Sequence, residues 1–135
     1  MKRFLSALAA VVMVMSIIVP GAYAQENRST DDLRALGIDT SHSVNVRDVV
    51  IRDPFVLVSG GIYYMYGTGA STVEGYGCYV SLDLETWYGP VNVFEAKDGF
   101  DGVNCFWAPE CHYYNGSYYL LASYGSASTG HRGTS

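Results

Sequence analysis

Two segments of the chain, residues 54–68 and 109–123, align without a gap at a separation of 55 residues. Each contains β-branched and aromatic residues around a central pair, Gly-Gly at 60–61 and Asn-Gly at 115–116. Such pairs tolerate positive φ at both positions, as the type I′ turn of a two-residue β-hairpin requires. The sequence therefore predicts two copies of one hairpin.

The first hairpin is followed by two more predicted strands, at 76–81 and 87–94, with a break in the second at Gly89-Pro90. The second strand of each hairpin, at 62–66 and 117–121, has apolar or aromatic residues on both alternating faces. We therefore expect both of these strands to be covered on both sides by neighbouring sheets.

A four-stranded unit that buries its faces against copies of itself is typical of a β-propeller, which closes with about 4 to 8 blades. The chain of 135 residues holds one such unit and part of a second. We expect an all-β fold that forms the first one and a half to two blades of a propeller, as the N-terminal part of a larger protein. A freestanding sandwich of five to six strands is the alternative.

The N-terminus has the pattern of an export signal, with a basic pair at 2–3, an uncharged run at 4–20 and small residues at 22 and 24. We expect cleavage after residue 24 and a secreted protein, extracellular or periplasmic, without membrane attachment. An uncleaved membrane anchor is the alternative, because about 20 apolar residues span a bilayer.

Beyond the signal, Ser29 and Gly37 are typical of the start and stop of one short helix. The predicted organisation is a signal peptide at 1–24, an N-terminal extension at 25–47 and an incomplete propeller domain at 48–135, with blade I at about 48–96 and the start of blade II at about 104–135.

The formal net charge is −5, and Lys97 is the only lysine beyond the predicted signal. This composition argues against a nucleic-acid partner, which requires clustered basic residues. Three cysteines cannot all pair within one chain, so a disulfide framework is excluded. Cys105 and Cys111 form a disulfide or stay unpaired, and the sequence leaves both open.

Asp53 stands immediately before Pro54, where an acidic residue is also ordinary turn chemistry. The matching position of the second copy is Ala108, so the hairpin does not need a carboxylate there to fold. Asp53 is therefore a candidate for a function at the ring centre, where the inner strands of a propeller begin.

Trp107 lies at the same point of the second copy, where an aromatic ring either stacks on a sugar or closes the gap between blades. Glu110 and His112 alternate along one predicted strand, so both project to one face. Two ligands do not make a metal site, and no metal site is predicted.

Several motifs in order resemble glycoside hydrolase family 43. They are Arg-Asp-Pro-Phe at 52–55, Gly-Ile-Tyr-Tyr-Met-Tyr-Gly-Thr at 61–68, Ser-Leu-Asp-Leu-Glu-Thr-Trp at 81–87, Phe-Trp-Ala-Pro-Glu-Cys-His at 106–112, Asn-Gly-Ser-Tyr-Tyr-Leu at 115–120 and Arg-Gly-Thr at 132–134. The resemblance covers residues 48–135. It implies a five-bladed propeller and inverting hydrolysis of glycosidic bonds, as in secreted β-xylosidases, α-L-arabinofuranosidases and arabinanases.

The resemblance also implies residue roles. Asp53 would be the general base, with Arg52 beside it as a substrate contact. Trp107 would be a platform for the sugar, and Glu110 a substrate contact rather than the general acid. The acid and the Asp that tunes it belong to the family's third and fourth blades. The structural calcium of some members depends on later blades, so no cofactor is predicted.

The leading hypothesis is a secreted glycosidase acting on arabinose- or xylose-containing plant cell-wall polysaccharide, inactive as this isolated chain. One alternative is a propeller-like protein that binds carbohydrate without catalysis. The other is a freestanding small β domain with an interaction role.

Overall fold

The computed structural model describes residues 27–134. The predicted signal peptide at 1–24 lies outside the described residues. The described elements are α1 (Thr30–Ala35), β1 (Val44–Asn45), the 3₁₀ helix η1 (Val46–Asp48), β2 (Arg52–Ser59), β3 (Ile62–Thr68), β4 (Gly75–Ser81), β5 (Thr86–Glu95), β6 (Gly102–Tyr114), β7 (Ser117–Ser126) and β8 (Arg132–Thr134).

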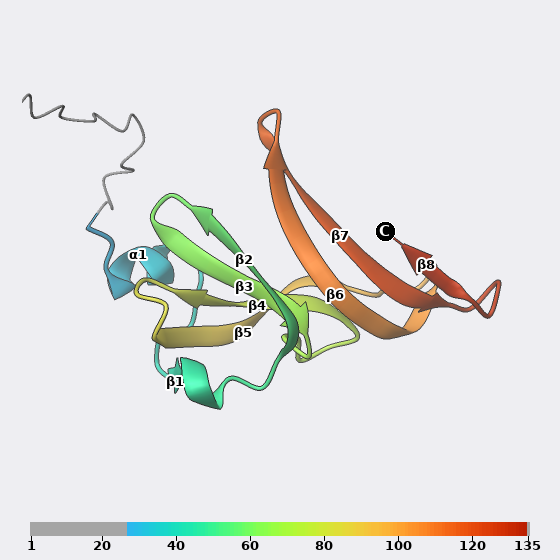
Figure 1. Ribbon diagram of the computed structural model, residues 1–135, viewed down its shortest axis with the longest axis horizontal. Helices are drawn as coiled ribbons and strands as arrows, with labels where there is room; N and C mark the ends of the chain where they lie inside the picture. Colours follow the sequence, from blue (N-terminus) through green and yellow to red (C-terminus); the bar gives the residue numbers. More distant parts are fainter. Residues whose placement is uncertain (1–26, 135) are drawn as a thin grey trace, which may run out of the picture.

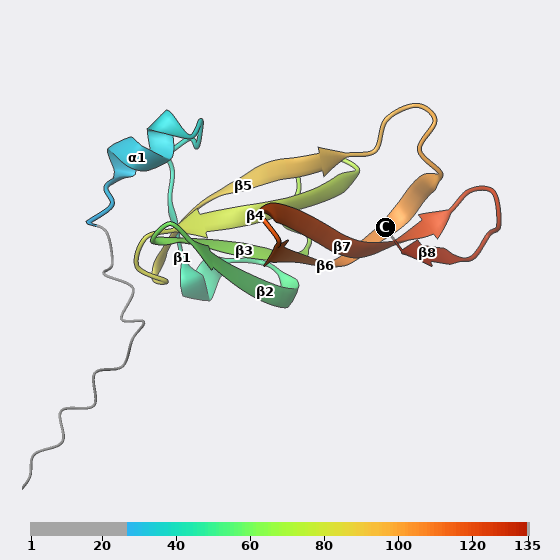
Figure 2. The same cartoon turned by 90° about the horizontal axis from the view of Figure 1, so that it is seen from above.

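The strands form two separate antiparallel sheets, as Figure 1 shows. The first has the order β1-β5-β4-β3-β2 and the second the order β6-β7-β8. The first strand of each predicted unit, β2 or β6, lies at a sheet edge, and β6 packs against β2 and β3. Figure 2 shows the second sheet extending beyond the first. The all-β prediction is confirmed.

Both predicted hairpin turns are present. Gly60 and Gly61 have φ values of 55° and 75°, and Asn115 and Gly116 have values of 47° and 85°. Positive φ at both central positions is the requirement of a type I′ turn, whose twist matches that of the flanking strands. The repeat in the sequence is therefore a repeat of hairpins in the structure.

The two copies differ in burial. On β3, Ile62, Met65 and Tyr66 are 3–7% exposed, so side chains on both alternating faces are buried. Within residues 27–134, however, only one neighbouring sheet packs against this strand, so the predicted cover by a sheet on each side is not found. On β7, Tyr118 and Tyr119 remain 55% and 49% exposed. The same prediction is wrong for β7, because in the described part of the chain no third sheet covers the second one.

The predicted break at Gly89-Pro90 is also wrong, since β5 runs through both residues. Gly89 adopts a φ of 125°, and the β4–β5 register shifts nearby, between Cys78 and Val80. Pairing with β4 therefore carries the strand across a dipeptide that would end an isolated strand.

The core lies between the two sheets. It joins Tyr66 and Cys78 of the first sheet to Cys111 of β6, and Leu33 of α1 is fully buried in the same cluster. Cys78, Cys105 and Cys111 are all free thiols. The unpaired alternative therefore holds for Cys105 and Cys111.

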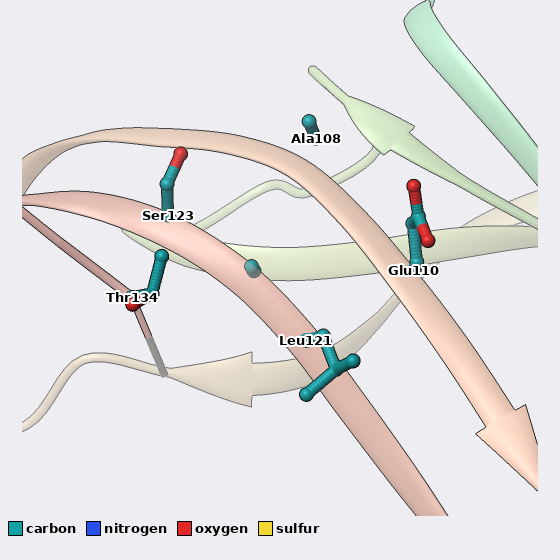
Figure 3. Close-up of a pocket in the computed structure, with 6 residues that line it drawn as sticks. Ala108, Glu110, Leu121, Ser123 and Thr134 are labelled. Atoms are coloured by element: carbon teal, nitrogen blue, oxygen red, sulfur yellow. The ribbon is translucent and has the colours of Figure 1, made fainter.

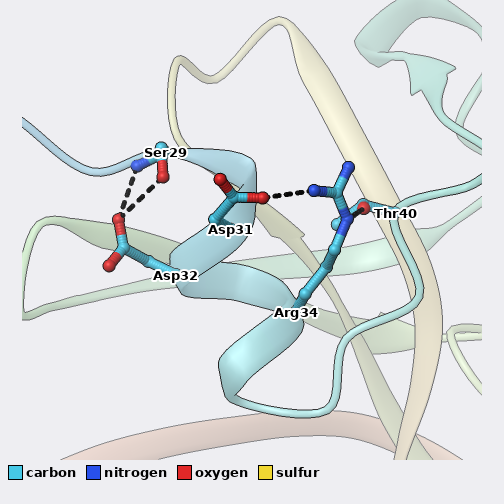
Figure 4. A network of polar contacts seen from close by, with 5 residues as sticks. All are labelled: Ser29, Asp31, Asp32, Arg34 and Thr40. Atoms are coloured by element: carbon cyan, nitrogen blue, oxygen red, sulfur yellow. Dashed lines mark hydrogen bonds and ion pairs between the residues drawn. The ribbon is translucent and has the colours of Figure 1, made fainter.

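The predicted short helix is present as α1, capped by Ser29. The backbone N–H and the hydroxyl of Ser29 both donate to the carboxylate of Asp32, at 2.7 Å and 3.2 Å (Figure 4). On the other side of the helix, Arg34 pairs with Asp31 and donates to the Thr40 hydroxyl at 2.7 Å. The described residues contain no helix with the length and apolarity needed to cross a membrane.

Candidate active site

Asp53 and Ala108 occupy matching positions in β2 and β6 and share an unusual backbone conformation. Their φ values are 52° and 46°, in the left-handed region. Each lies where the register of its hairpin shifts, so each belongs to a β-bulge. A bulge removes a residue from the regular ladder of hydrogen bonds and redirects its backbone and side chain.

These two bulges meet at Thr68, the last residue of β3. The hydroxyl of Thr68 donates to Oδ2 of Asp53 at 3.1 Å, and the backbone N–H of Ala108 donates to the same hydroxyl oxygen at 2.8 Å. Thr68 is 9% exposed, whereas Asp53 is exposed. The carboxylate of Asp53 is therefore attached to the second sheet through one buried hydroxyl.

A pocket of about 510 Å³ opens beside this contact. Figure 3 shows residues that line it, among them Glu110 on β6 and Leu121 and Ser123 on β7. Ala108 contributes both to this pocket and to the hydrogen bond with Thr68. The full lining consists of Ala108, Glu110, Leu121, Ala122, Ser123 and Thr134.

Trp107 is half-buried, and the guanidinium carbon of Arg132 lies 3.8 Å from its ring centroid. A cation at this distance is attracted to the electron-rich ring face and restricts the ring's movement. Arg132 therefore covers one face of Trp107, and a sugar stacked on this ring would use the other face.

Glu110 and His112 do project to one face of β6, as their alternation predicts. His112 Nε2 lies 3.0 Å from Glu110 Oε2, and the His112 ring lies 4.9 Å from the Phe55 ring of β2. The side chains of His112 and Glu110 remain 46% and 52% exposed, so this is a surface pair whose charge attraction requires protonated His112.

Of the four residues predicted for the site, the structure brings three to the region around Ala108. Asp53 is joined to it through Thr68, Trp107 precedes it in β6, and Glu110 lines the same pocket. Arg52 is exposed at the start of β2, next to Asp53 in the chain.

Sequence reasoning did not single out Thr68 or Arg132 as parts of the site. The repeat held a signal for Thr68, because the matching residue is Ser123, also with a hydroxyl. Within residues 27–134, no group of three or more His, Cys, Asp or Glu side chains comes together as a metal site.

Two antiparallel sheets that pack against each other, each containing one copy of the hairpin, form the arrangement of neighbouring blades in a β-propeller. Residues 45–135 match the family described as Glycosyl hydrolases family 43, and the chain belongs to that family. The resemblance in the sequence motifs is thereby confirmed.

Two solved structures are similar to this chain. The endo-arabinase from Bacteroides thetaiotaomicron VPI-5482 is 36% identical over 70% of the chain, with a TM-score of 0.61. A thermostable family-43 glycoside hydrolase is 32% identical over 62% of the chain, with a TM-score of 0.52. The aligned parts are 33% and 27% of those two proteins, so the chain spans about a third of their length or less. No curated protein matches the chain.

Proposed function

We propose that this chain forms the N-terminal part of a secreted glycosidase, which hydrolyses O-glycosidic bonds in arabinose- or xylose-containing polysaccharides with inversion. Membership of the family supports hydrolysis of a glycosidic bond. The similarity to an endo-arabinase supports an arabinose-containing polysaccharide as the first substrate to test. The export pattern at 1–24 supports secretion.

The observation that carries this proposal is the placement of Asp53. Its carboxylate is exposed, yet it is held through Thr68 at the junction of the two sheets, next to the pocket that Ala108 lines. We assign it the role of general base, which accepts a proton from the water that attacks the anomeric carbon. Inversion leaves about 6.5–9.5 Å between base and acid, so that water fits on one side of the sugar.

The remaining site residues are assigned to the substrate. Trp107, with one ring face covered by Arg132, offers its other face to a sugar ring. Glu110 contributes a hydrogen-bond acceptor in the pocket, and Arg52 contributes donors beside Asp53. We assign the general acid to chain beyond residue 135, so the 135-residue chain alone is expected to give no measurable hydrolysis.

The test is Asp53→Asn in the longest natural protein that contains this chain, assayed on arabinan and on aryl arabinofuranoside and xyloside. Loss of the base is expected to lower kcat by about 10²–10⁴-fold, because the attacking water keeps its proton. Asp48→Asn, which changes an exposed Asp in η1, is the matched control and should leave kcat unchanged.

Wild-type turnover in Asp53→Asn would remove the base assignment. Ordinary turnover by the 135-residue chain alone would remove the assignment of the acid to later sequence. Tight binding of the polysaccharide by the longest protein without any hydrolysis would instead support the role of a carbohydrate-binding protein.

A further inference from the structure

The hydroxyl of Thr68 has two hydrogen-bonding neighbours, one that donates and one that accepts. A backbone N–H can only donate a hydrogen bond, so the Thr68 oxygen must accept from Ala108. An ionised carboxylate can only accept, so the single hydroxyl proton of Thr68 must point to Oδ2 of Asp53. The two partners together leave the hydroxyl one orientation, and each hydrogen bond polarises the other.

The matching residue of the second hairpin makes a different contact. Ser123 lies opposite Trp107 in the second hairpin, just as Thr68 lies opposite Arg52 in the first. The hydroxyl of Ser123 donates to the Trp107 carbonyl at 3.4 Å. The bulge therefore folds in β6 without a hydroxyl-to-carboxylate contact. The contact between Thr68 and Asp53 is additional to what the hairpin itself requires.

We propose that Thr68 is a positioning residue, which holds one oxygen of the Asp53 carboxylate toward the junction of the sheets and leaves the other oxygen for the nucleophilic water. Within the described part of the chain, Oδ1 of Asp53 has no hydrogen-bond partner. This proposal rests on the role of Asp53 as general base.

The first test uses NMR on the 135-residue chain and needs no catalytic activity. In the wild type, the chemical shift of the Ala108 amide proton is expected to follow the ionisation of Asp53, because Thr68 connects the two groups. Thr68→Ser keeps the hydroxyl and should keep this response. Thr68→Val keeps the shape and should lose it, as Asp53→Asn should.

Other titratable groups near this junction are Glu110 and His112 on β6 and the buried Tyr66 on β3. Ionisation of these groups should shift the Ala108 amide proton equally in every variant. The pH response that remains in Asp53→Asn is therefore the part that these groups cause. A response in Thr68→Val equal to that of the wild type would overturn the proposal.

The second test measures kinetics in the longest natural protein that contains this chain. Thr68→Val is expected to lower kcat by about 10–10²-fold with little change in KM, as expected when a reacting group is misplaced by about 1 Å. The loss should be the same for aryl glycosides with good and poor leaving groups, because the base acts on water in both. Thr68→Ser should restore kcat to near the wild-type value.

The two tests separate this proposal from the proposed function. An active Asp53→Asn enzyme would refute the base assignment itself. An inactive Asp53→Asn enzyme together with full turnover in Thr68→Val would refute only the role of Thr68. A lower Tm in Thr68→Val without any fall in kcat would identify Thr68 as a purely structural residue and overturn its positioning role.

Discussion

Each of the three cysteines has its own environment, although all three are free thiols. Cys78 and Cys111 are 2% and 6% exposed between the two sheets, whereas Cys105 is half-buried at the start of the second hairpin. Burial, with a smaller effect from neighbouring Cys111, raises the pKa of the Cys78 thiol to about 12. Because the thiolate is the reactive form, Cys78 is both shielded and chemically unreactive at neutral pH.

We therefore expect a thiol reagent at pH 8 to modify only Cys105 in the folded chain. The number of modified thiols per chain, measured by mass spectrometry, should be one under native conditions and three in denaturant. Cys105→Ser should react only after unfolding. Rapid native labelling of Cys105→Ser would show that Cys78 or Cys111 is accessible.

For single residues, the sequence predicted which side chain is a functional candidate, but it did not predict the backbone conformation at that position. Comparison of the two copies singled out Asp53, because Ala108 has no carboxylate. It did not predict the left-handed φ of either residue, since a following proline restricts the helical region without selecting a positive φ. The contact of Thr68 with Ala108 joins residues 40 positions apart, and it depends on how the sheets pack.

Among the elements, the connection between β4 and β5 shows most directly how side chains hold a turn. Oδ1 of Asp83 accepts hydrogen bonds from the backbone N–H groups of Glu85 and Thr86, at 2.8 Å and 2.7 Å, and from the Ser81 hydroxyl at 3.1 Å. The buried Trp87 donates to the Leu84 carbonyl at 3.0 Å. The turn is therefore closed by hydrogen bonds on the outside and by Trp87 on the inside.

The hydrogen bonds to Asp83, that from the Thr86 N–H above all, lower its pKa in the folded chain. Its contribution to stability is therefore fully present above the unfolded pKa of about 3.9 and is lost as pH falls through the lower folded pKa. Asp83→Ala should cost about 0.5–2 kcal/mol at pH 7, like the loss of a capping residue.

Urea unfolding at pH 7 and at pH 3 measures this contribution. The difference between the wild type and Asp83→Ala should shrink at the lower pH. Asp98→Ala, in the exposed loop after β5, is the control and should change stability little at pH 7. An equal difference at both pH values would show that the Asp83 charge does not stabilise the turn.

Element prediction succeeded where the local sequence decides the conformation. The turn pairs at 60–61 and 115–116 allow few alternatives, and α1 has a capping box at Ser29. It failed at Gly89-Pro90, because β5 pairs with β4 on both sides of this dipeptide, at Tyr88 and Val91, and this pairing outweighs the local tendency to break.

In the whole molecule, hydrogen bonds join the two sheets at three places along their junction. The Tyr76 hydroxyl donates to the Ser123 carbonyl at 2.9 Å, and Ala108 donates to Thr68 at 2.8 Å. Near the hairpin turns, the hydroxyls of Ser59 and Tyr118 are hydrogen-bonded to each other. The second hairpin also has four exposed tyrosines, Tyr113, Tyr114, Tyr118 and Tyr119.

Exposed aromatic side chains on a sheet favour association between chains. The 135-residue chain is therefore expected to self-associate with rising concentration in sedimentation velocity. The double variant Tyr114→Lys with Tyr119→Lys should stay monomeric at higher concentration with an unchanged Tm. Leu36→Lys, which replaces an exposed apolar residue near α1, should associate like the wild type.

Equal association of the wild type and the double lysine variant would show that another surface is responsible. The repeat predicted the second hairpin, but the predicted cover on both faces of β7 is absent. It did not predict which faces are uncovered, because that depends on packing between residues far apart in the sequence.

The hydrogen bonds across the junction and the core between the sheets together hold one sheet at a fixed tilt against the next. In any ring built from such sheets, the tilts between neighbours must add up to one full turn. The number of sheets in a ring therefore depends on the tilt at each junction, to which Tyr76, Thr68 and their partners contribute. We therefore expect a substitution among them to change the angle between the two sheets even if each hairpin folds normally.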